Sequence, residues 1–481
     1  MSLRKAAISG LLWTISQQFS VQIINFIVQI ILARILLPEE FGLIGMMTVF
    51  MAIGMSLADS GMASSLIRTE NPTQTDYSTV FFTNIAVSVF VYIIIYSTAG
   101  FVADFYHQPN LSNILRVYTL SFIIRAFSTV QTTRLTKEMN FKLQMKIQIP
   151  SVIISGIAGI VFAFAGYGVW SLVWMNLLQS LLLTIQYWIR SKWIPNWIFD
   201  RERLKYHFNF GYKLTVSSLL NTLFTNIYVI VIGKFFTPTI LGYYTRAQTM
   251  QMFPVQNIAT ALNKVTYPMF ASIQNDDVKL KSAYKKLMEQ VLFWLAPLMI
   301  ILIVTATPLF RFVLTDKWLP AVPYFQLLCI SGILFPLQSY NLNILNVKGR
   351  SDLFLKIELI KKLLTIAGVC CIVFFGIYGL LFFRVASSFI SFFVNSQYSG
   401  RMINFSSLEQ LKSVVPIIIL ASLIGCLVWG IDYYFLGRGI DIVRILCCGI
   451  LYFIIYLTIS YLLKIPALKE FKFVILNNLK K

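Results

Sequence analysis

The sequence predicts an all-α integral membrane protein with fourteen transmembrane helices. Of its 481 residues, 57% are hydrophobic and only 12% are charged, whereas about 25% of an ordinary soluble domain is charged. The apolar residues form long runs, and one membrane-spanning helix needs about 20 such residues. The 40 Lys and Arg residues outnumber the 19 Asp and Glu residues and lie mostly between these runs. This pattern excludes a soluble enzyme and favours a membrane protein over a nucleic-acid-binding one.

The first apolar run follows a basic start and is too long and too polar for a cleaved signal peptide, so we expect a retained helix. Two of the later stretches are divided by short glycine-containing turns at 165–168 and 376–379. Without these turns, each stretch would form a helix about twice as long as the bilayer core is thick. The predicted spans are 9–33, 41–66, 80–103, 113–134, 147–165, 169–189, 212–233, 241–263, 290–312, 321–346, 358–376, 380–398, 413–430 and 442–463.

The basic residues predict the orientation of the chain. With the N-terminus in the cytoplasm, 30 of the 40 Lys and Arg residues fall in inner loops and tails, 6 fall at the outer side and 4 lie within helices. Cytoplasmic loops carry the excess of Lys and Arg. We therefore predict that both termini are cytoplasmic.

An internal repeat divides the chain into two halves. Each half has a cation, a proline and a glycine at matching places, 200 residues apart: Arg34, Pro38 and Gly42, then Lys234, Pro238 and Gly242. The turn that ends at Gly168 likewise matches the turn that ends at Gly379. Six helices per repeat give two copies in the same orientation, with the substrate site expected between them. We predict a six-helix lobe at 1–205, a second at 206–405, and helices 13 and 14 with a cytoplasmic tail at 406–481.

The segment ARILLPEEFG at 33–42 resembles the exit of the first helix in Wzx-type polysaccharide flippases of the MOP superfamily, in its polysaccharide transporter branch. The sequence DSG, from Asp59 to Gly61 at the end of the second span, and the arrangement of six, six and two helices are also similar to that family. Arg34, Pro38, Gly42, Asp59 and Gly61, with the repeat's Lys234, Pro238 and Gly242, are expected to be structural motif residues.

The resemblance implies a flippase of the bacterial inner membrane that moves an undecaprenyl-pyrophosphate-linked oligosaccharide by alternating access. Its product would serve synthesis of O-antigen, capsule or exopolysaccharide. The implied partners are the lipid-linked oligosaccharide, membrane lipids and other membrane proteins of polysaccharide assembly, without nucleic acid. Two alternatives stay open: a cation-coupled exporter of small molecules from the same superfamily, and a membrane-embedded glycan polymerase or ligase.

Observations on the residues weigh against both alternatives. The middles of the predicted helices lack the acidic residue that a cation-coupled exporter would need. Outer loops are too short for the large loop expected of a glycan polymerase or ligase, and there is no Walker motif for ATP. The six cysteines lie within apolar runs, and His107 and His207 are far apart in sequence, so we expect no cofactor and no metal site.

Four arginines lie within predicted spans, where each costs about 2.5–3.5 kcal/mol at the bilayer centre. Arg125 is near the middle of its helix, so we expect it to face a water-filled cavity, the alternative being a structural hydrogen-bond partner. Arg116, Arg246 and Arg384 lie closer to the outer boundary, and reaching out to the headgroups is an equally good explanation for them. Asn257 and Lys264 share a helix face with Arg246, although Lys264 also fits an ordinary cytoplasmic flank. Together these cations are the predicted substrate-binding residues, because they suit a phosphate.

A polar stripe runs along the first helix. Thr14, Gln18, Gln22, Asn25 and Gln29 are spaced by four or three residues, which places them on one helix face. Such a face avoids lipid and contacts either protein or water. We predict that Gln18, Gln22, Asn25 and Gln29, with Asn257, form the polar wall of the cavity, the alternative being hydrogen bonds between helices.

Overall fold

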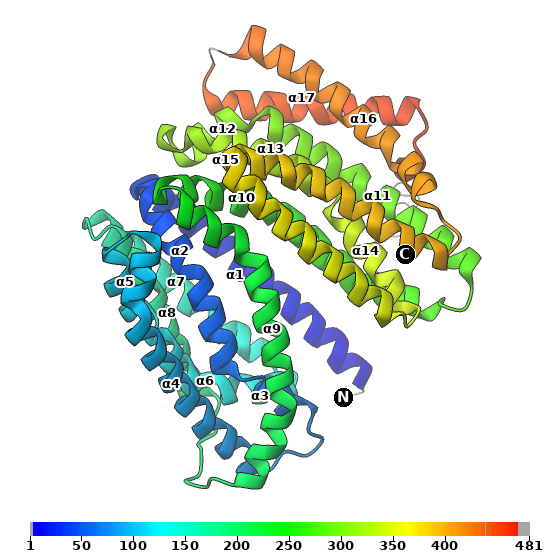
Figure 1. Ribbon diagram of the computed structural model, residues 1–481. Coiled ribbons are helices and arrows are strands. Elements are labelled where there is room, and N and C mark those ends of the chain that lie inside the picture. The colour runs from blue at the N-terminus through cyan, green and yellow to red at the C-terminus, as the bar shows by residue number, and fades with distance from the viewer. Residues whose placement is uncertain (1–2, 438, 470–481) are drawn as a thin grey trace. The chain divides into compact units, whose positions relative to one another are not determined.

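We describe the fold from a computed structural model of the chain (Figure 1). It describes the backbone of residues 3–437 and 439–469, and within that span the side chains of all but 3–12, 15 and 260–265. Every regular element in this part of the chain is helical. Eleven helical stretches are long and apolar enough to cross a membrane. The prediction of an all-helical membrane protein is therefore confirmed.

The chain divides into two compact units, residues 1–242 and 243–481. Unit 1 holds nine helices and the first residues of α10. Its packing pairs are α1 with α7, α7 with α8, α6 with α8, α4 with α6, and α2 with α4 and α9. The helices are α1 (Leu3–Ile35), α2 (Pro38–Asp59), α3 (Met62–Arg68), α4 (Gln74–Tyr106), α5 (Asn110–Tyr118), α6 (Leu120–Lys137), α7 (Phe141–Phe164), α8 (Val169–Arg190) and α9 (Arg201–Phe235).

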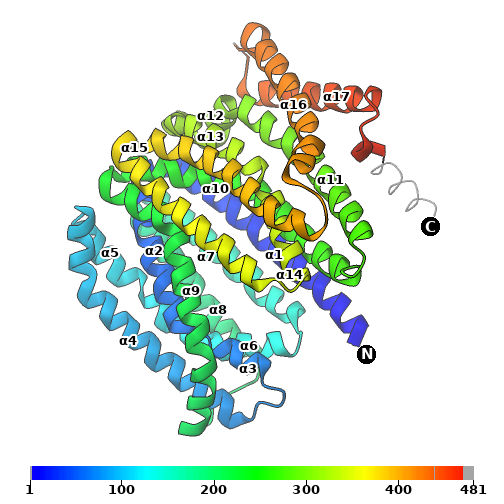
Figure 2. The same ribbon diagram turned by 45° about the vertical axis from the view of Figure 1, so that its right-hand side comes forward.

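Unit 2 contains most of α10 and all later helices. In it α14 packs against α15, and α16 lies along α11 with α17 beside it (Figure 2). The elements are α10 (Pro238–Ser272), α11 (Asp277–Val304), α12 (Ala306–Leu314), η1 (Asp316–Ala321), α13 (Val322–Ile333), α14 (Phe335–Val347), α15 (Ser351–Met402), α16 (Ser407–Ile431), η2 (Asp432–Leu436) and α17 (Asp441–Leu462). The predicted lobe boundary at 205/206 is a different division of the chain, and it stays a prediction.

Local chemistry explains where the helices begin. Thr73 and Asp76 form a capping box at the start of α4, and Ser406 and Glu409 form another at the start of α16. These side chains satisfy backbone N–H groups that have no partner within the helix. Asp276 caps α11, and hydrogen bonds from Lys279 hold the pKa of the Asp276 carboxyl below its ordinary value.

The two predicted glycine turns are present. The chain leaves α7 and enters α8 through Gly166 and Gly168, whose φ angles are +83° and +54°. The long helix α15 is interrupted at Gly376, where φ is +67° and ψ is −162°. Backbone of this kind favours glycine, because it has no Cβ. Each of the two stretches is thus divided, as predicted.

Candidate functional site

The polar stripe of α1 lies on its own face of the helix. α1 packs against α7 through Val28, whose side chain meets Gly156. The stripe lies beside that contact on the helix surface, with Gln18 and Asn25 exposed and Gln22 and Gln29 half-buried. Ile23 and Ile27, with exposed fractions of 48% and 51%, lie on the opposite side of the helix. An exposed polar face and an exposed apolar face therefore share one transmembrane helix.

Arg125 projects from α6 toward neighbouring helices of unit 1. Its Nε donates a hydrogen bond to Ser180 Oγ of α8 at 2.9 Å, and its Nη1 lies 3.9 Å from Met55 Sδ of α2. The arginine is half-buried. Two nitrogens of the guanidinium thus have partners in the protein, one of them the weak acceptor sulfur of Met55, in a side chain that carries five N–H donors.

Arg116 is placed differently from Arg125 because the predicted fourth span is broken. α5 ends at Tyr118 and α6 begins at Leu120, so the two arginines belong to separate helices. The Arg116 guanidinium lies over the Tyr96 ring of α4, 4.6 Å from its centroid, and its Nε donates to the Tyr96 carbonyl oxygen at 3.3 Å. The structure does not bring Arg116 into contact with Arg125.

In unit 2, Arg246 and Arg384 are both held against aromatic side chains. Arg246 of α10 has an exposed fraction of only 6%, and its guanidinium lies 5.4 Å from the centroid of the Trp318 ring. Arg384 of α15 donates through Nη1 to the hydroxyl of Tyr244, two residues before Arg246 on α10. The two arginines therefore approach the same end of α10, which the sequence did not indicate.

The other two predicted site residues of α10, Asn257 and Lys264, have fewer described contacts. Asn257 is half-buried and donates through Nδ2 to the Phe253 carbonyl of its own helix at 2.7 Å. The side chain of Lys264 lies outside the described residues. Among the described residues, no group of three or more His, Cys, Asp or Glu side chains could hold a metal ion.

The two copies of the repeat motif pack against each other, backbone to backbone. A Cβ added at Gly42 would lie 1.8 Å from the Pro238 carbonyl oxygen, and one added at Gly242 would lie 1.9 Å from that of Pro38. Each glycine thus allows the other copy's proline to approach, because no larger residue fits. Pro38 and Pro238 are also the first residues of α2 and α10, a position where proline costs no helical hydrogen bond.

A second close backbone contact joins α9 to the far end of α2. A Cβ on Gly61 would lie 2.4 Å from the Gly211 carbonyl oxygen, and one on Gly211 would lie 2.3 Å from that of Ser60. Asp59, the last residue of α2, is exposed beside this contact. α9 is therefore held against the end of α2 at Gly211, near its own start.

Each cation of the motif lies in the last turn of a helix, Arg34 in α1 and Lys234 in α9. Lys234 Nζ donates to the Phe105 carbonyl oxygen at 2.7 Å and lies 3.2 Å from His107 Nε2. Arg34 is exposed at the end of α1. Lys234 ties the end of α9 to the end of α4, which adds a polar contact beside the glycine contact.

A buried polar cluster that sequence reasoning missed lies at the start of α9. His207 and Asp76 have exposed side-chain fractions of 0% and 1%, and His207 Nε2 lies 3.2 Å from Asp76 Oδ1. The other ring nitrogen is 2.8 Å from Ser65 Oγ, and Arg203 lies 3.5 Å from the same carboxylate. Asp76 and Ser65 are 131 and 142 positions from His207 in the sequence. The local sequence could indicate only the capping box of Thr73 and Asp76.

The chain is similar to known proteins of polysaccharide biosynthesis. The profile of the family described as "Polysaccharide biosynthesis protein" matches residues 31–323. The chain is 27% identical to the teichuronic acid biosynthesis protein TuaB of Bacillus subtilis over 73% of each chain. It is 25% identical to the lipopolysaccharide biosynthesis protein WzxC of Escherichia coli, over 77% of this chain and 75% of that one. It is 24% identical to the succinoglycan biosynthesis transport protein ExoT of Rhizobium meliloti, over 68% and 67%.

Solved structures share the fold at low sequence identity. The lipid II flippase MurJ, in an inward closed conformation, matches with a TM-score of 0.70 and 16% identity over 94% of this chain and 99% of that one. An inward-facing multidrug resistance MATE transporter of the MOP superfamily matches with a TM-score of 0.60 and 14% identity, over 80% and 96%. The predicted resemblance is confirmed: the chain belongs to the Wzx-like polysaccharide biosynthesis family, whose members are membrane flippases and transporters, not enzymes.

Proposed function

We propose that this membrane transporter of polysaccharide biosynthesis flips an undecaprenyl-pyrophosphate-linked oligosaccharide across the bacterial inner membrane by alternating access. The relatives named for teichuronic acid, lipopolysaccharide and succinoglycan synthesis support a substrate of this class. The glycan would serve a surface polysaccharide such as O-antigen, capsule or exopolysaccharide. Other membrane proteins of the same assembly pathway would receive it.

The observation that carries this proposal is the exposed polar stripe of α1. Gln18 and Asn25 are exposed on a helix whose opposite face exposes Ile23 and Ile27. Lipid accepts the isoleucine face, but amides in hydrocarbon lose hydrogen bonds to water. The stripe therefore suits a water-filled passage, and amide side chains offer donors and acceptors to the hydroxyls of a hydrated glycan.

The arginines supply the complementary charge for the pyrophosphate. Arg125 is held by Ser180 through Nε and only weakly by Met55 through Nη1, so its other donors are available to a phosphate oxygen. Arg246 and Arg384 offer a second cationic position at one end of α10, with Asn257 and Lys264 further along the same helix. The stacking of Arg116 on Tyr96 favours a structural role for that residue. In the proposed cycle the cations hold the pyrophosphate, the glycan follows the α1 stripe, and the prenyl chain stays in lipid.

The proposed topology has fourteen spans, with both termini in the cytoplasm. The eleven candidate stretches become twelve when α15 is divided at Gly376, and α10 and the α5–α6 pair complete the set. The first twelve form two parallel six-helix lobes, 1–205 and 206–405, and the last two belong to 406–481. A reporter fused after Gln108 should then be periplasmic, and one fused after Arg203 cytoplasmic.

A deletion strain tests the function. Loss of the flippase should leave the lipid-linked unit on the cytoplasmic leaflet, and expression of this chain should restore its passage. Translocated but unpolymerised units would instead indicate an enzyme of glycan assembly and would contradict the proposal. Export of small amphiphiles without any effect on the lipid-linked unit would indicate the drug-exporter alternative.

Thiol labelling tests the stripe itself. In a variant without the native cysteines, Cys at Gln22, Asn25 or Gln29 should react with a water-soluble thiol reagent. Cys at Ile23 and Ile27 is the matched control and should react at least about tenfold more slowly, because thiolate forms poorly in lipid. Equal protection of all five positions would mean that the stripe is buried between helices.

A further inference from the structure

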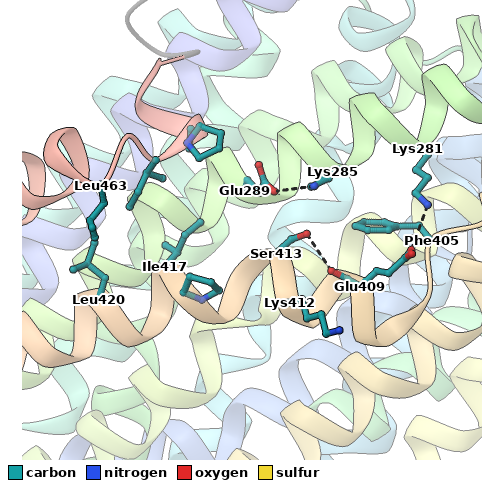
Figure 3. A pocket seen from close by; sticks show the side chains of 14 residues that line it. Lys281, Lys285, Glu289, Phe405, Glu409, Lys412, Ser413, Ile417, Leu420 and Leu463 are labelled. Atoms are coloured by element: carbon teal, nitrogen blue, oxygen red, sulfur yellow. Dashed lines mark hydrogen bonds and ion pairs between the residues drawn. The ribbon is translucent and has the colours of Figure 1, made fainter.

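A pocket outside the predicted substrate path opens in unit 2 between α11, the first turns of α16 and residues 463–467 (Figure 3). Its volume is about 670 Å³, within the usual range for small-molecule sites. Charged side chains gather at one end, around Lys281, Lys285 and Glu409. Ile417, Leu420 and Leu463 line the other end. The pocket is thus amphipathic along its length.

The walls of the pocket are held in place by specific contacts. Glu409 belongs to the capping box of α16, and its carboxylate also lies 3.3 Å from Lys281 Nζ of α11. On the opposite side, the Gln290 side chain of α11 lies against residue Ala467, and with its amide oriented to satisfy both neighbours it donates to the Ala467 carbonyl oxygen at 2.9 Å and accepts from Trp294 Nε1 at 3.1 Å. Residues 463–467 are therefore fixed to α11, and the pocket is a built feature of the fold.

The charge at the polar end is net positive. The lining contributes three lysines and two glutamates. Lys281 pairs with Glu409 at 3.3 Å, and Lys285 lies 3.9 Å from Glu289, a long contact. Lys412 is exposed on α16, one turn beyond Glu409. Lys464 and Lys469 are exposed beside the lining residues of the 463–467 segment, so an anion at this end would be attracted.

The position along the helices places the pocket at the level of lipid headgroups. α11 and α16 begin here and α17 ends here, and in the proposed orientation all three ends face the cytoplasm. The polar end would lie at the headgroups and the apolar end in the acyl region. Basic pockets between transmembrane helices on this side suit anionic lipid headgroups.

We propose that this pocket binds an anionic phospholipid of the cytoplasmic leaflet. Lys285 and Lys412 contact the phosphate of the headgroup, and one acyl chain lies along Ile417, Leu420 and Leu463. The proposal uses the proposed orientation but not the transport activity. The lipid would fasten α16 and the end of α17 to α11 as a structural ligand, separate from the lipid-linked substrate.

Native mass spectrometry of the purified full chain tests the proposal. Phosphatidylglycerol should bind more tightly than phosphatidylcholine with the same acyl chains. The double variant Lys285→Gln/Lys412→Gln should lose about 25-fold in phosphatidylglycerol affinity, because each lysine near an anionic headgroup contributes roughly fivefold. Lys279→Gln/Lys356→Gln is the matched control, with two lysines of unit 2 outside the pocket, and should bind like the parent.

Further measurements distinguish a phospholipid from other phosphate-bearing ligands, and distinguish loss of binding from misfolding. Lys285→Arg/Lys412→Arg should keep the affinity, because the charge is retained. Leu420→Trp fills the apolar end and should weaken both phospholipids. Inorganic phosphate should not compete. Equal affinity for the two phospholipids, an equal loss in the control variant, or stronger binding of undecaprenyl phosphate at the same lysines would each overturn the proposal. Because no arm measures transport, failure here is distinct from failure of the proposed function.

Discussion

The two copies of the repeat motif make matching backbone contacts with each other, whereas the arginines proposed to bind the substrate differ in their surroundings. Gly42 and Gly242 each accept the backbone of the other copy's proline in almost the same way, at 1.8 and 1.9 Å from an added Cβ. Arg125 is half-buried and bonded to a serine, whereas Arg246 is nearly fully buried against Trp318. The contact between the two motif copies is thus nearly the same from either side, whereas the two arginines stand at positions that the 200-residue offset does not match, since it pairs Arg246 with Met46 and Arg125 with Phe325.

The largest effect should follow from breaking the close backbone contacts between Gly42 and Pro238 and between Gly242 and Pro38. Gly42→Leu and Gly242→Leu each drive a side chain into a backbone carbonyl, which the helices can relieve only by moving apart. We expect each variant to lose more than about 3 kcal/mol of stability, the upper end for overpacked sites, and to yield little folded protein in size-exclusion chromatography.

Gly100→Leu is the control for this prediction, because a Cβ there meets nothing within 4 Å. It should be recovered like the parent chain. If Gly42→Leu and Gly100→Leu give equal amounts of folded protein, Gly42 is not in close contact with the Pro238 backbone.

The polar cluster should matter next, because it holds the other end of α9. Asp76→Ala leaves His207 and Arg203 without their carboxylate partner, and loss of one member of a buried pair costs about 3–5 kcal/mol. Thermal unfolding in detergent should show a clear decrease in Tm. Asp277→Ala removes an exposed pair with Lys348 and should change the Tm little; similar decreases in the two variants would contradict the structural role of the cluster.

The two arginines should give smaller and unequal effects. Arg125→Ala should reduce transport of the lipid-linked unit by about 10- to 150-fold, the loss of one charge-assisted contact. Arg246→Ala should reduce transport similarly and also lower stability by about 0.5–2 kcal/mol, because it removes the cation–π contact with Trp318. Lys at either position tests whether charge alone suffices.

Transport is measured in cells and normalised to the amount of folded protein. Arg190→Ala, which removes an exposed arginine of unit 1, is the matched control and should transport normally. Parental transport by both alanine variants would make Arg125 and Arg246 structural residues and would place the phosphate site elsewhere.

Much of the fold was readable from the sequence because its signals are local. Apolar runs of bilayer length predict the helices, and the turns at Gly168 and Gly376 lie where unbroken helices would be too long. The matching prolines and glycines predicted a repeated structural motif. Their mutual contact needed the structure, because it joins Gly42 to Pro238 and Gly242 to Pro38, which are 196 and 204 positions apart.

The parts that sequence reasoning missed depend on tertiary contacts. The break between α5 and α6 falls at Thr119, with no glycine or proline at the break. His207 is an isolated residue in sequence and gains its partners only when α9 packs beside α3 and α4. The half-burial of Arg125 and near-complete burial of Arg246 likewise reflect the packing of other helices. Helix depth placed Arg125 in the middle and Arg246 nearer the outer boundary, so it did not predict that Arg246 is the more buried of the two.

The proposed function requires this chain to carry a lipid-linked oligosaccharide from one leaflet to the other. Purified protein in proteoliposomes, with an undecaprenyl-pyrophosphate oligosaccharide in the bilayer, tests it most directly through the fraction of glycan that a membrane-impermeant glycosidase can reach. We expect the initially protected glycan to become accessible with the parent chain and with Arg190→Ala, and much more slowly with Arg125→Ala. Protection that persists with the folded parent chain as in protein-free liposomes, across imposed ion gradients of either direction, would contradict it.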